Sequence, residues 1–159
     1  MIFSNPSEYA IRALSELVLV AADPVQTSGR KPGYVMLDRL VENASLPREF
    51  LAKIFRQLVE GGILLSAKGP GGGFALARTA HEITLLNIIE AVDGTSRTDG
   101  CVVGLSRCDD SMPCPQHDLF KPIRQRLKAY LATTTLADTA ASLRDKRASI
   151  AKNVPVVAK

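Results

Sequence analysis

The sequence lacks any apolar run long enough to span a membrane, and it lacks the basic start and long apolar stretch of a signal peptide. It also lacks a strong charge bias, because the formal net charge is only +4 and the pI is near 9.1. We therefore expect a soluble, cytoplasmic protein without a membrane partner. So modest a charge is compatible with a polyanionic partner, but the placement of the basic residues has to decide.

Catalytic arrangements are missing too. Periodicity places no paired carboxylates, Ser-His pair or Cys-His pair in a pocket, so we do not expect an enzyme. A glycine-rich stretch, Gly69-Pro-Gly-Gly-Gly73, is not followed by Gly-Lys-Ser/Thr or by a helix, which excludes a phosphate-binding loop of the P-loop type. With 159 residues, 46% of them hydrophobic, the chain can form one proper core.

All three cysteines and one of the two histidines lie in a single stretch, Cys101 to His117. Three cysteines cannot pair completely, which argues against a disulfide scaffold. Clustered thiolates in a segment with Gly, Pro and Asp and no helical or strand periodicity are suited to a metal or an iron-sulfur cluster. We favour such a centre over a disulfide scaffold and over three unrelated buried cysteines.

The N-terminal half is predicted to be helical. Asn5 suits a helix cap, Pro6 the first helical position, and Glu8 can reach back as in a capping box; the helix should end by Asp23-Pro24. Two short helices follow over about 35–42 and 46–60. The turn between them completes a helix-turn-helix.

The second of these short helices has two distinct faces. Its buried stripe should consist of Leu51, Ile54, Phe55 and Leu58, and its outer face carries Arg48, Glu49, Ala52, Lys53 and Arg56. Three cations with one anion suit contact with DNA, although an ordinary solvated face is the alternative.

Two short strands are predicted next, over 63–68 and 74–78, with Leu65/Ala67 and Phe74/Leu76 alternating against polar or small residues. The glycine-rich stretch joins them, and Lys68 and Arg78 flank it. A hairpin directly after a helix-turn-helix makes a winged helix, whose glycines permit close approach to a DNA backbone.

Helical periodicity returns after the wing. We expect a buried helix over 84–93, with His81 before it as a surface or capping histidine. From residue 118 a helix with an apolar stripe is predicted, and we prefer pairing with a second subunit over packing within one domain. A further helix over 136–147 and a mobile tail over 148–159 complete the chain.

The wing sequence Lys68-Gly-Pro-Gly-Gly-Gly-Phe-Ala-Leu76 and the three-cysteine stretch, in this order after a winged helix-turn-helix, resemble the IscR/NsrR-type iron-sulfur transcription regulators of the Rrf2 family. The similarity covers roughly residues 1–145. It implies a homodimer, double-stranded operator DNA as partner, and a redox-sensing iron-sulfur cluster held by three cysteines and one other ligand. The spacing Cys101-x6-Cys108 is one residue longer than is usual in the family, and Lys68 stands where arginine is common.

We therefore expect a mostly α protein with a small β-hairpin wing: a winged helix-turn-helix over 1–93, a cluster-binding loop over 94–117 and dimerisation helices over 118–147. Cys101, Cys108 and Cys114 should hold the cluster, with [2Fe-2S] preferred and [4Fe-4S] possible. The resemblance favours His117 as fourth ligand and leaves Glu8 as its rival, supplied from the opposite subunit.

For DNA, we expect Arg48, Glu49 and Lys53 to face base edges, Arg56 to lie nearer the backbone, and the wing to reach the minor groove through Lys68, Gly71 and Gly72. Two alternatives remain open. One is a winged-helix regulator that uses the cysteine loop for zinc or for thiol/disulfide sensing, and the other is a small iron-sulfur electron carrier.

Overall fold

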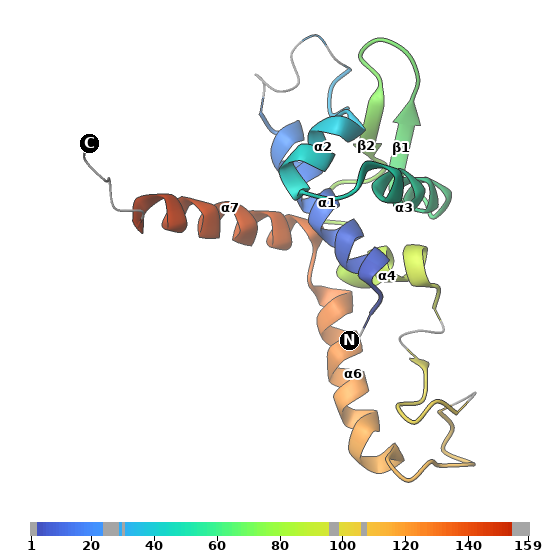
Figure 1. Cartoon of the computed structure of the whole chain (residues 1–159). Coiled ribbons are helices and arrows are strands. Elements are labelled where there is room, and N and C mark those ends of the chain that lie inside the picture. Colours follow the sequence, from blue (N-terminus) through green and yellow to red (C-terminus); the bar gives the residue numbers. More distant parts are fainter. Residues whose placement is uncertain (1–2, 24–28, 30, 96–98, 106–107, 154–159) are drawn as a thin grey trace.

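The computed structural model describes residues 3–23, 29, 31–95, 99–105 and 108–153. Within these ranges the elements are α1 (Asn5–Ala21), α2 (Leu37–Ala44), α3 (Arg48–Glu60), β1 (Leu64–Ala67), β2 (Gly73–Leu76), α4 (Leu85–Asp93), α6 (His117–Thr133) and α7 (Leu136–Asn153). Figure 1 shows a body built from α1 to α4 and the β1–β2 hairpin, from which α6 and α7 run out in different directions. The predicted fold class, mostly α with a small β-hairpin wing, is confirmed. None of the described helices is both long and apolar enough to cross a membrane.

One apolar core holds the body together, and α1 lies at its centre, packed against α2, α3, α4 and α7. The largest completely covered side chains are Leu14, Leu17, Leu40, Leu51, Ile54, Phe55, Leu58, Ile63, Leu64, Ile83, Ile88 and Ile89. The four residues of α3 that were predicted to face inward are among them, so that prediction is confirmed. Phe55 meets Phe74 of β2 edge to face, with ring centroids 5.0 Å apart.

The start of α1 differs from the prediction. Ser4 is the cap, and its hydroxyl accepts a hydrogen bond from the N–H of Ser7 at 3.2 Å, whereas Asn5 is already helical. The prediction of Asn5 as cap, with Glu8 closing a capping box, is therefore wrong. The reason is a tertiary contact: the Asp93 carboxylate at the end of α4 accepts from both the N–H (2.9 Å) and the hydroxyl of Ser4.

The helix-turn-helix is formed by α2 and α3. Ser45 connects them in the left-handed conformation, with φ 52° and ψ 51°. The Arg12 guanidinium on α1 donates to the carbonyl oxygen of Ala44 at 2.7 Å and so ties this turn to the central helix. Helix α2 begins later than predicted because Val35 pairs with Phe74 of the wing in an isolated antiparallel bridge.

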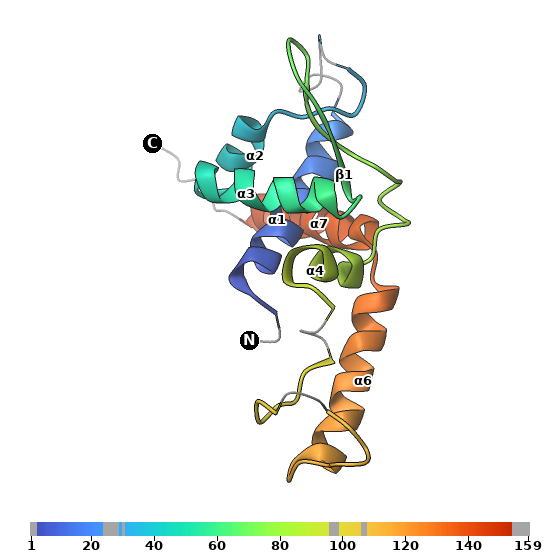
Figure 2. The same ribbon diagram turned by 90° about the vertical axis from the view of Figure 1, so that its right-hand side faces the viewer.

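The wing is a two-stranded antiparallel hairpin in which Leu64 pairs with Leu76 and Ala67 with Gly73. Its inward face differs from the predicted alternation: Leu64 is buried, whereas Leu65 is 49% exposed. The hairpin projects from the body (Figure 2), and it meets the core through Leu64 of β1 and through Phe74 and Leu76 of β2. Gly73 is required at its place, because a Cβ there would lie 2.3 Å from the carbonyl oxygen of Val35.

A capped junction joins the body to α6 and α7. Thr84 and Asn87 form a capping box at the start of α4, and the N–H of Leu85 donates to the carbonyl oxygen of Thr134 at 3.0 Å. Thr135 and Asp138 cap α7 in the same reciprocal way. Helix α7 extends to Asn153, beyond the predicted end at 147, so part of the expected tail is helical; residues 154–159 lie outside the described part of the chain.

Candidate functional site

The outer face of α3 is the first candidate site. Arg48, Glu49, Lys53 and Arg56 are all exposed, on the side of the helix opposite the core. The guanidinium Nε of Arg48 lies 2.5 Å from the carboxylate of Asp38 on α2, and this ion pair is itself exposed. Three cations therefore point away from the body on the second helix of the helix-turn-helix, as was expected for a helix that contacts DNA.

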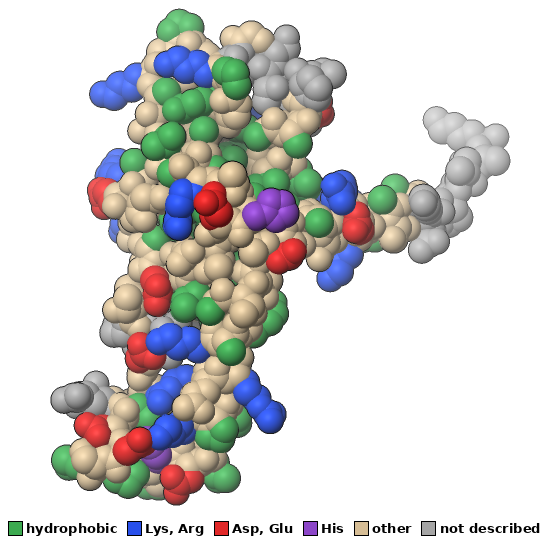
Figure 3. Space-filling view, turned by 180° about the vertical axis from the view of Figure 1, so that it is seen from behind, with side chains coloured by type: hydrophobic (Ala, Val, Ile, Leu, Met, Phe, Trp, Pro, Cys, Tyr) green, Lys and Arg blue, Asp and Glu red, His purple; other side chains and the backbone are tan. Residues whose placement is uncertain are grey.

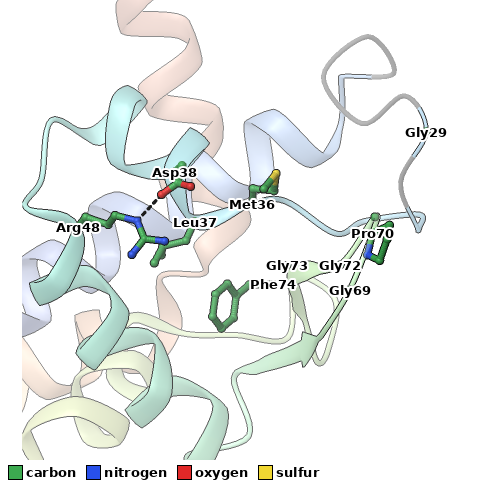
Figure 4. Close-up of a pocket in the computed structure, with 11 residues that line it drawn as sticks. Gly29, Met36, Leu37, Asp38, Arg48, Gly69, Pro70, Gly72, Gly73 and Phe74 are labelled. Carbon is green, nitrogen blue, oxygen red and sulfur yellow. Dashed lines mark hydrogen bonds and ion pairs between the residues drawn. The ribbon is translucent and has the colours of Figure 1, made fainter.

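A groove runs between this helix and the wing. It has a volume of about 460 Å³ and is lined by the first residues of α2, by Arg48 and by the wing residues 69–74. Figure 4 shows Arg48 and Asp38 facing one another at one end of the groove and Pro70 at the other, on the tip of the hairpin. The hairpin and the first turn of α3 therefore border a common concave surface.

In the wing, the charged residue and the glycines differ in exposure. Lys68 is exposed at the end of β1, whereas Gly72 is buried. A Cβ on Gly72 would lie 2.3 Å from the carbonyl oxygen of Ala67, so the hairpin itself requires this glycine. Gly71, with φ 74°, adopts a left-handed conformation suited to glycine.

The cysteine loop is the second candidate site, and its described part lies at the end of α6 that is far from the wing (Figures 1 and 2). The donor side chains gather there in two pairs. The thiols of Cys101 and Cys114 are within hydrogen-bonding reach of one another, and the Cys108 Sγ lies 3.5 Å from the His117 Nδ1. Cys114 and His117 are 8% and 5% exposed, so the end of α6 shields both of them.

The thiols differ in acidity. A hydrogen bond from the backbone N–H of Val103 is the main cause that lowers the pKa of Cys101, with further help from the N–H of Leu105. For Cys114, the backbone N–H of Gln116 favours the thiolate, but burial and the neighbouring thiols outweigh it and raise the pKa. Cys101 therefore loses its proton more readily than Cys114, and the thiolate is the form that acts as a nucleophile or metal ligand.

Three basic residues of α6 hold the loop in place. Lys121 donates to both oxygens of Asp110, at 2.6 and 2.7 Å, and Lys128 donates to both oxygens of Asp99, at 2.8 and 3.1 Å. Arg124 donates to the carbonyl oxygen of Gly100 at 3.2 Å. The spacing of the three cations places them on one side of α6, and Figure 3 shows side chains of both signs gathered around this lower end of the molecule.

His117 is joined to this network. Its Nε2 lies 2.7 Å from the Oδ1 of Asp110. The hydrogen bonds from Lys121 and then from His117 lower the pKa of Asp110, so its carboxylate is ionised and accepts both. Sequence reasoning missed Asp110 as a partner of His117, because no periodicity in this irregular segment relates the two residues.

The donor side chains of the cysteine loop determine which bound centre it could hold. Within the described residues, no three His, Cys, Asp or Glu side chains are already positioned around a single metal ion. Two pairs of donors, Cys101 with Cys114 and Cys108 with His117, instead match the needs of a centre with two metal atoms, and thiolate with imidazole is a ligand set that iron accepts. The residues present therefore fit an iron-sulfur cluster in their chemistry.

Glu8 is not brought to these side chains within the chain. It lies in the first turn of α1, on the body, and Figures 1 and 2 show that turn well separated from the start of α6. A role for Glu8 as ligand would need the opposite subunit and stays a prediction. His81 is exposed, in agreement with the expected surface histidine.

Comparison with known proteins agrees with this architecture. A sequence model of the Rrf2 family, described as iron-dependent transcriptional regulators, matches residues 3–142. The HTH-type transcriptional regulator IscR of Yersinia pseudotuberculosis serotype O:1b (strain IP 31758) is 28% identical over 138 residues, which cover 87% of this chain and 78% of that protein.

Solved structures share the fold. CymR, the global cysteine regulator of B. subtilis, superposes with a TM-score of 0.67 at 24% identity and covers 88% of this chain and 96% of its own. IscR of T. potens superposes with a TM-score of 0.62 at 20% identity, over 90% of this chain and 86% of its own. At these identities the likeness concerns the fold alone.

Proposed function

This chain belongs to the Rrf2 family of transcriptional regulators, and from that premise we propose that its binding to operator DNA is controlled by an iron-sulfur cluster held in the cysteine loop. As a member of this family it is a regulator and not an enzyme. Membership also favours a regulator over the electron carrier. We also propose that the protein acts in the cytoplasm, where a DNA-binding regulator of this family meets its operator.

The pairing of donors in the loop carries the proposal. Cys101, Cys108, Cys114 and His117 would hold the cluster, and their arrangement as two pairs favours [2Fe-2S] over [4Fe-4S], because each pair can serve one iron. When bound, the cluster supplies a redox-active centre that responds to oxidants. The name IscR among the relatives agrees with a cluster, whereas the description of CymR as a cysteine regulator points to other signals in the same fold.

DNA would be bound by the body. Arg48, Glu49 and Lys53 on the exposed face of α3 would meet base edges, and Arg56 would meet the backbone. Lys68 and Gly71 of the wing would follow the adjacent minor groove, and the buried Gly72 would contribute by closing the hairpin. A homodimer would then require two half-sites about one helical turn, roughly 34 Å, apart.

A chain of contacts connects the two sites. The loop follows directly on α4, whose last residue, Asp93, holds Ser4 at the start of α1. Arg12, also on α1, donates to the carbonyl oxygen of Ala44 and so holds the turn of the helix-turn-helix. Ordering of the loop around a cluster can thus bias how α3 is presented, through contacts already in place.

The decisive experiment compares the cluster-loaded and cluster-free protein. Protein purified anaerobically should show the visible absorption of an iron-sulfur cluster, with iron and sulfide in equal amounts, and its affinity for operator DNA should differ from that of the cluster-free form by about 5- to 150-fold. Equal affinities for every operator tested would leave the cluster a structural role only and contradict the proposal.

A second candidate function rests on the contact between the thiols of Cys101 and Cys114. An oxidant such as a peroxide could take two electrons and two protons from this pair, form a disulfide and be reduced to water. Colourless protein that binds DNA only in one thiol state, with the mass of two hydrogens lost on oxidation, would favour this mechanism. Stoichiometric zinc without iron would instead support a zinc site.

A further inference from the structure

The His117 side chain is constrained on both edges of its ring. The Nε2 lies 2.7 Å from the Oδ1 of Asp110, and the Nδ1 lies 3.5 Å from the Cys108 Sγ. The side chain is 5% exposed, although His117 is the first residue of α6 and precedes a solvent-exposed Asp118. An imidazole that is covered and engaged at both nitrogens cannot turn over without breaking two contacts.

The two contacts have different chemistry. A carboxylate only accepts hydrogen bonds, so the proton of the neutral ring lies on Nε2 and the lone pair lies on Nδ1. The hydrogen bond made by one ring nitrogen decides which nitrogen is left to bind a metal. In this geometry the nitrogen left over is Nδ1, which faces Cys108.

Asp110 is in turn held by Lys121. The Nζ of Lys121 lies 2.6 and 2.7 Å from the two oxygens of Asp110, and this anchor stands on α6, one turn beyond His117. The neighbouring Asp109 has a different task, because its Oδ1 accepts from the N–H and hydroxyl of Ser111 and closes the turn there. Of two adjacent aspartates, one shapes the loop and the other faces the imidazole.

We propose that Asp110, anchored by Lys121, is the positioning residue that presents the Nδ1 of His117 to the cysteines of the loop. The inference rests on the proposed function where it concerns the cluster, since His117 would then bind iron through Nδ1. Asp110 does not bind the metal itself; it acts through His117. Its removal loosens the imidazole and leaves the three thiolates in place.

The first test needs no cluster. In cluster-free protein labelled with ¹⁵N-histidine, the chemical shifts of the two ring nitrogens report which one carries the proton, and His81→Gln assigns the signals because the chain has two histidines. At a mildly alkaline pH, His117 should be protonated on Nε2 in the wild type and in the control Asp109→Asn, and should become a mixture of tautomers in Asp110→Ala. An unchanged tautomer in Asp110→Ala would overturn the proposal.

The second test uses the loaded protein. Asp110→Ala should accelerate loss of the cluster to a chelator by about 10- to 100-fold, because removing the partner of a metal-binding histidine costs about that factor in metal affinity. Asp110→Asn, which keeps an oxygen acceptor, should restore part of the lifetime, and Asp109→Asn should remain close to the wild type. Thermal melting of each variant checks that the body is folded, as expected because Asp110 is 71% exposed.

A double-mutant comparison separates positioning from a general effect on the loop. If Asp110 acts through His117, Asp110→Ala should add no further acceleration in a His117→Ala background. Additive acceleration would contradict the proposal. If the tautomer of His117 changes as expected but the protein never binds a cluster, the proposed function fails and the positioning role stands. If a cluster forms but the tautomer does not change, the positioning role fails and the proposed function stands.

Discussion

In the body, Leu14, Leu51 and Phe55 expose no side-chain surface, whereas in the cysteine loop Val102 and Met112 expose 50% and 80% of theirs. The body is therefore held together mainly by burial of apolar groups. The described part of the loop has little apolar burial, and apart from contacts within the loop it is held by hydrogen bonds and ion pairs to one side of α6. The proposed function would use this division, with a stable DNA-binding body beside a segment weak enough to respond to a ligand.

A substitution in the core of the body should have the largest effect on stability. Phe55→Ala removes a side chain that is completely covered and stacked edge to face on Phe74, so it should lower the free energy of unfolding by about 3–5 kcal/mol. Urea denaturation followed by circular dichroism measures this. Leu65→Ala, at a 49% exposed position of the wing, is the control and should have a small effect. A small effect of Phe55→Ala as well would contradict a body held by burial.

The next prediction concerns DNA binding by the body. Arg48→Ala should weaken binding to a specific operator by about 1–3 kcal/mol if Arg48 contacts a base, and Lys68→Ala should weaken binding with less dependence on sequence. Because the cluster is proposed to bias how α3 is presented, the loss for Arg48→Ala should be larger in the form that binds the operator more tightly. Titrations at one fixed salt concentration decide this, and unchanged binding of both variants would refute the assignment.

Removing the cap at the junction between the body and α7 should lower the free energy of unfolding by an intermediate amount. The hydroxyl of Thr135 accepts from the N–H of Asp138 at 3.1 Å and caps α7, so Thr135→Ala should cost about 1 kcal/mol of unfolding free energy. Thr135→Ser keeps the hydroxyl and serves as control. Equal melting temperatures of Thr135→Ala and the wild type would show that α7 is held by its contacts with α1 and not by its cap.

The contacts that hold the loop should contribute less. Lys128 and Asp99 form an exposed ion pair, with side chains 41% and 58% exposed. Lys128→Ala should therefore lower the free energy of unfolding by only about 0.2–1 kcal/mol. Its effect should be local: hydrogen exchange should rise around residues 99–105 and remain unchanged in α1 and α3. Slower or unaltered exchange in the loop would show that this ion pair does not hold it.

The smallest effect should come from pH. The hydroxyl of Thr135, and then its N–H, lower the pKa of Asp138 below the ordinary 3.8. A carboxyl group with a lowered pKa contributes stability above its ordinary value and loses it as the pH falls through the lowered one. The difference in melting temperature between wild type and Asp138→Asn should therefore be present near neutral pH and disappear in strong acid. A difference that persists there would assign it to another cause.

Local patterns were enough to predict much of the molecule. Hydrophobic periodicity and the positions of glycine are properties of neighbouring residues. They predict the inward stripe of α3, the hairpin after it and the exposed outer face with Arg48 and Lys53. The predictions failed where distant residues decide. Ser4 replaces Asn5 as the cap of α1 because Asp93, at the end of α4, binds it.

Closeness along the chain alone places the three cysteines and His117 in one short segment. How these side chains pair and what holds them depends on helix packing, because Lys121 and Arg124 of α6 fasten the loop, and Asp110 of the loop meets His117 at the start of that helix. An ion pair such as that of Glu16 on α1 with Arg147 on α7 is of the same kind. Charge contacts carry no periodicity, so which cation meets which carboxylate depends on the packing of the helices that bear them.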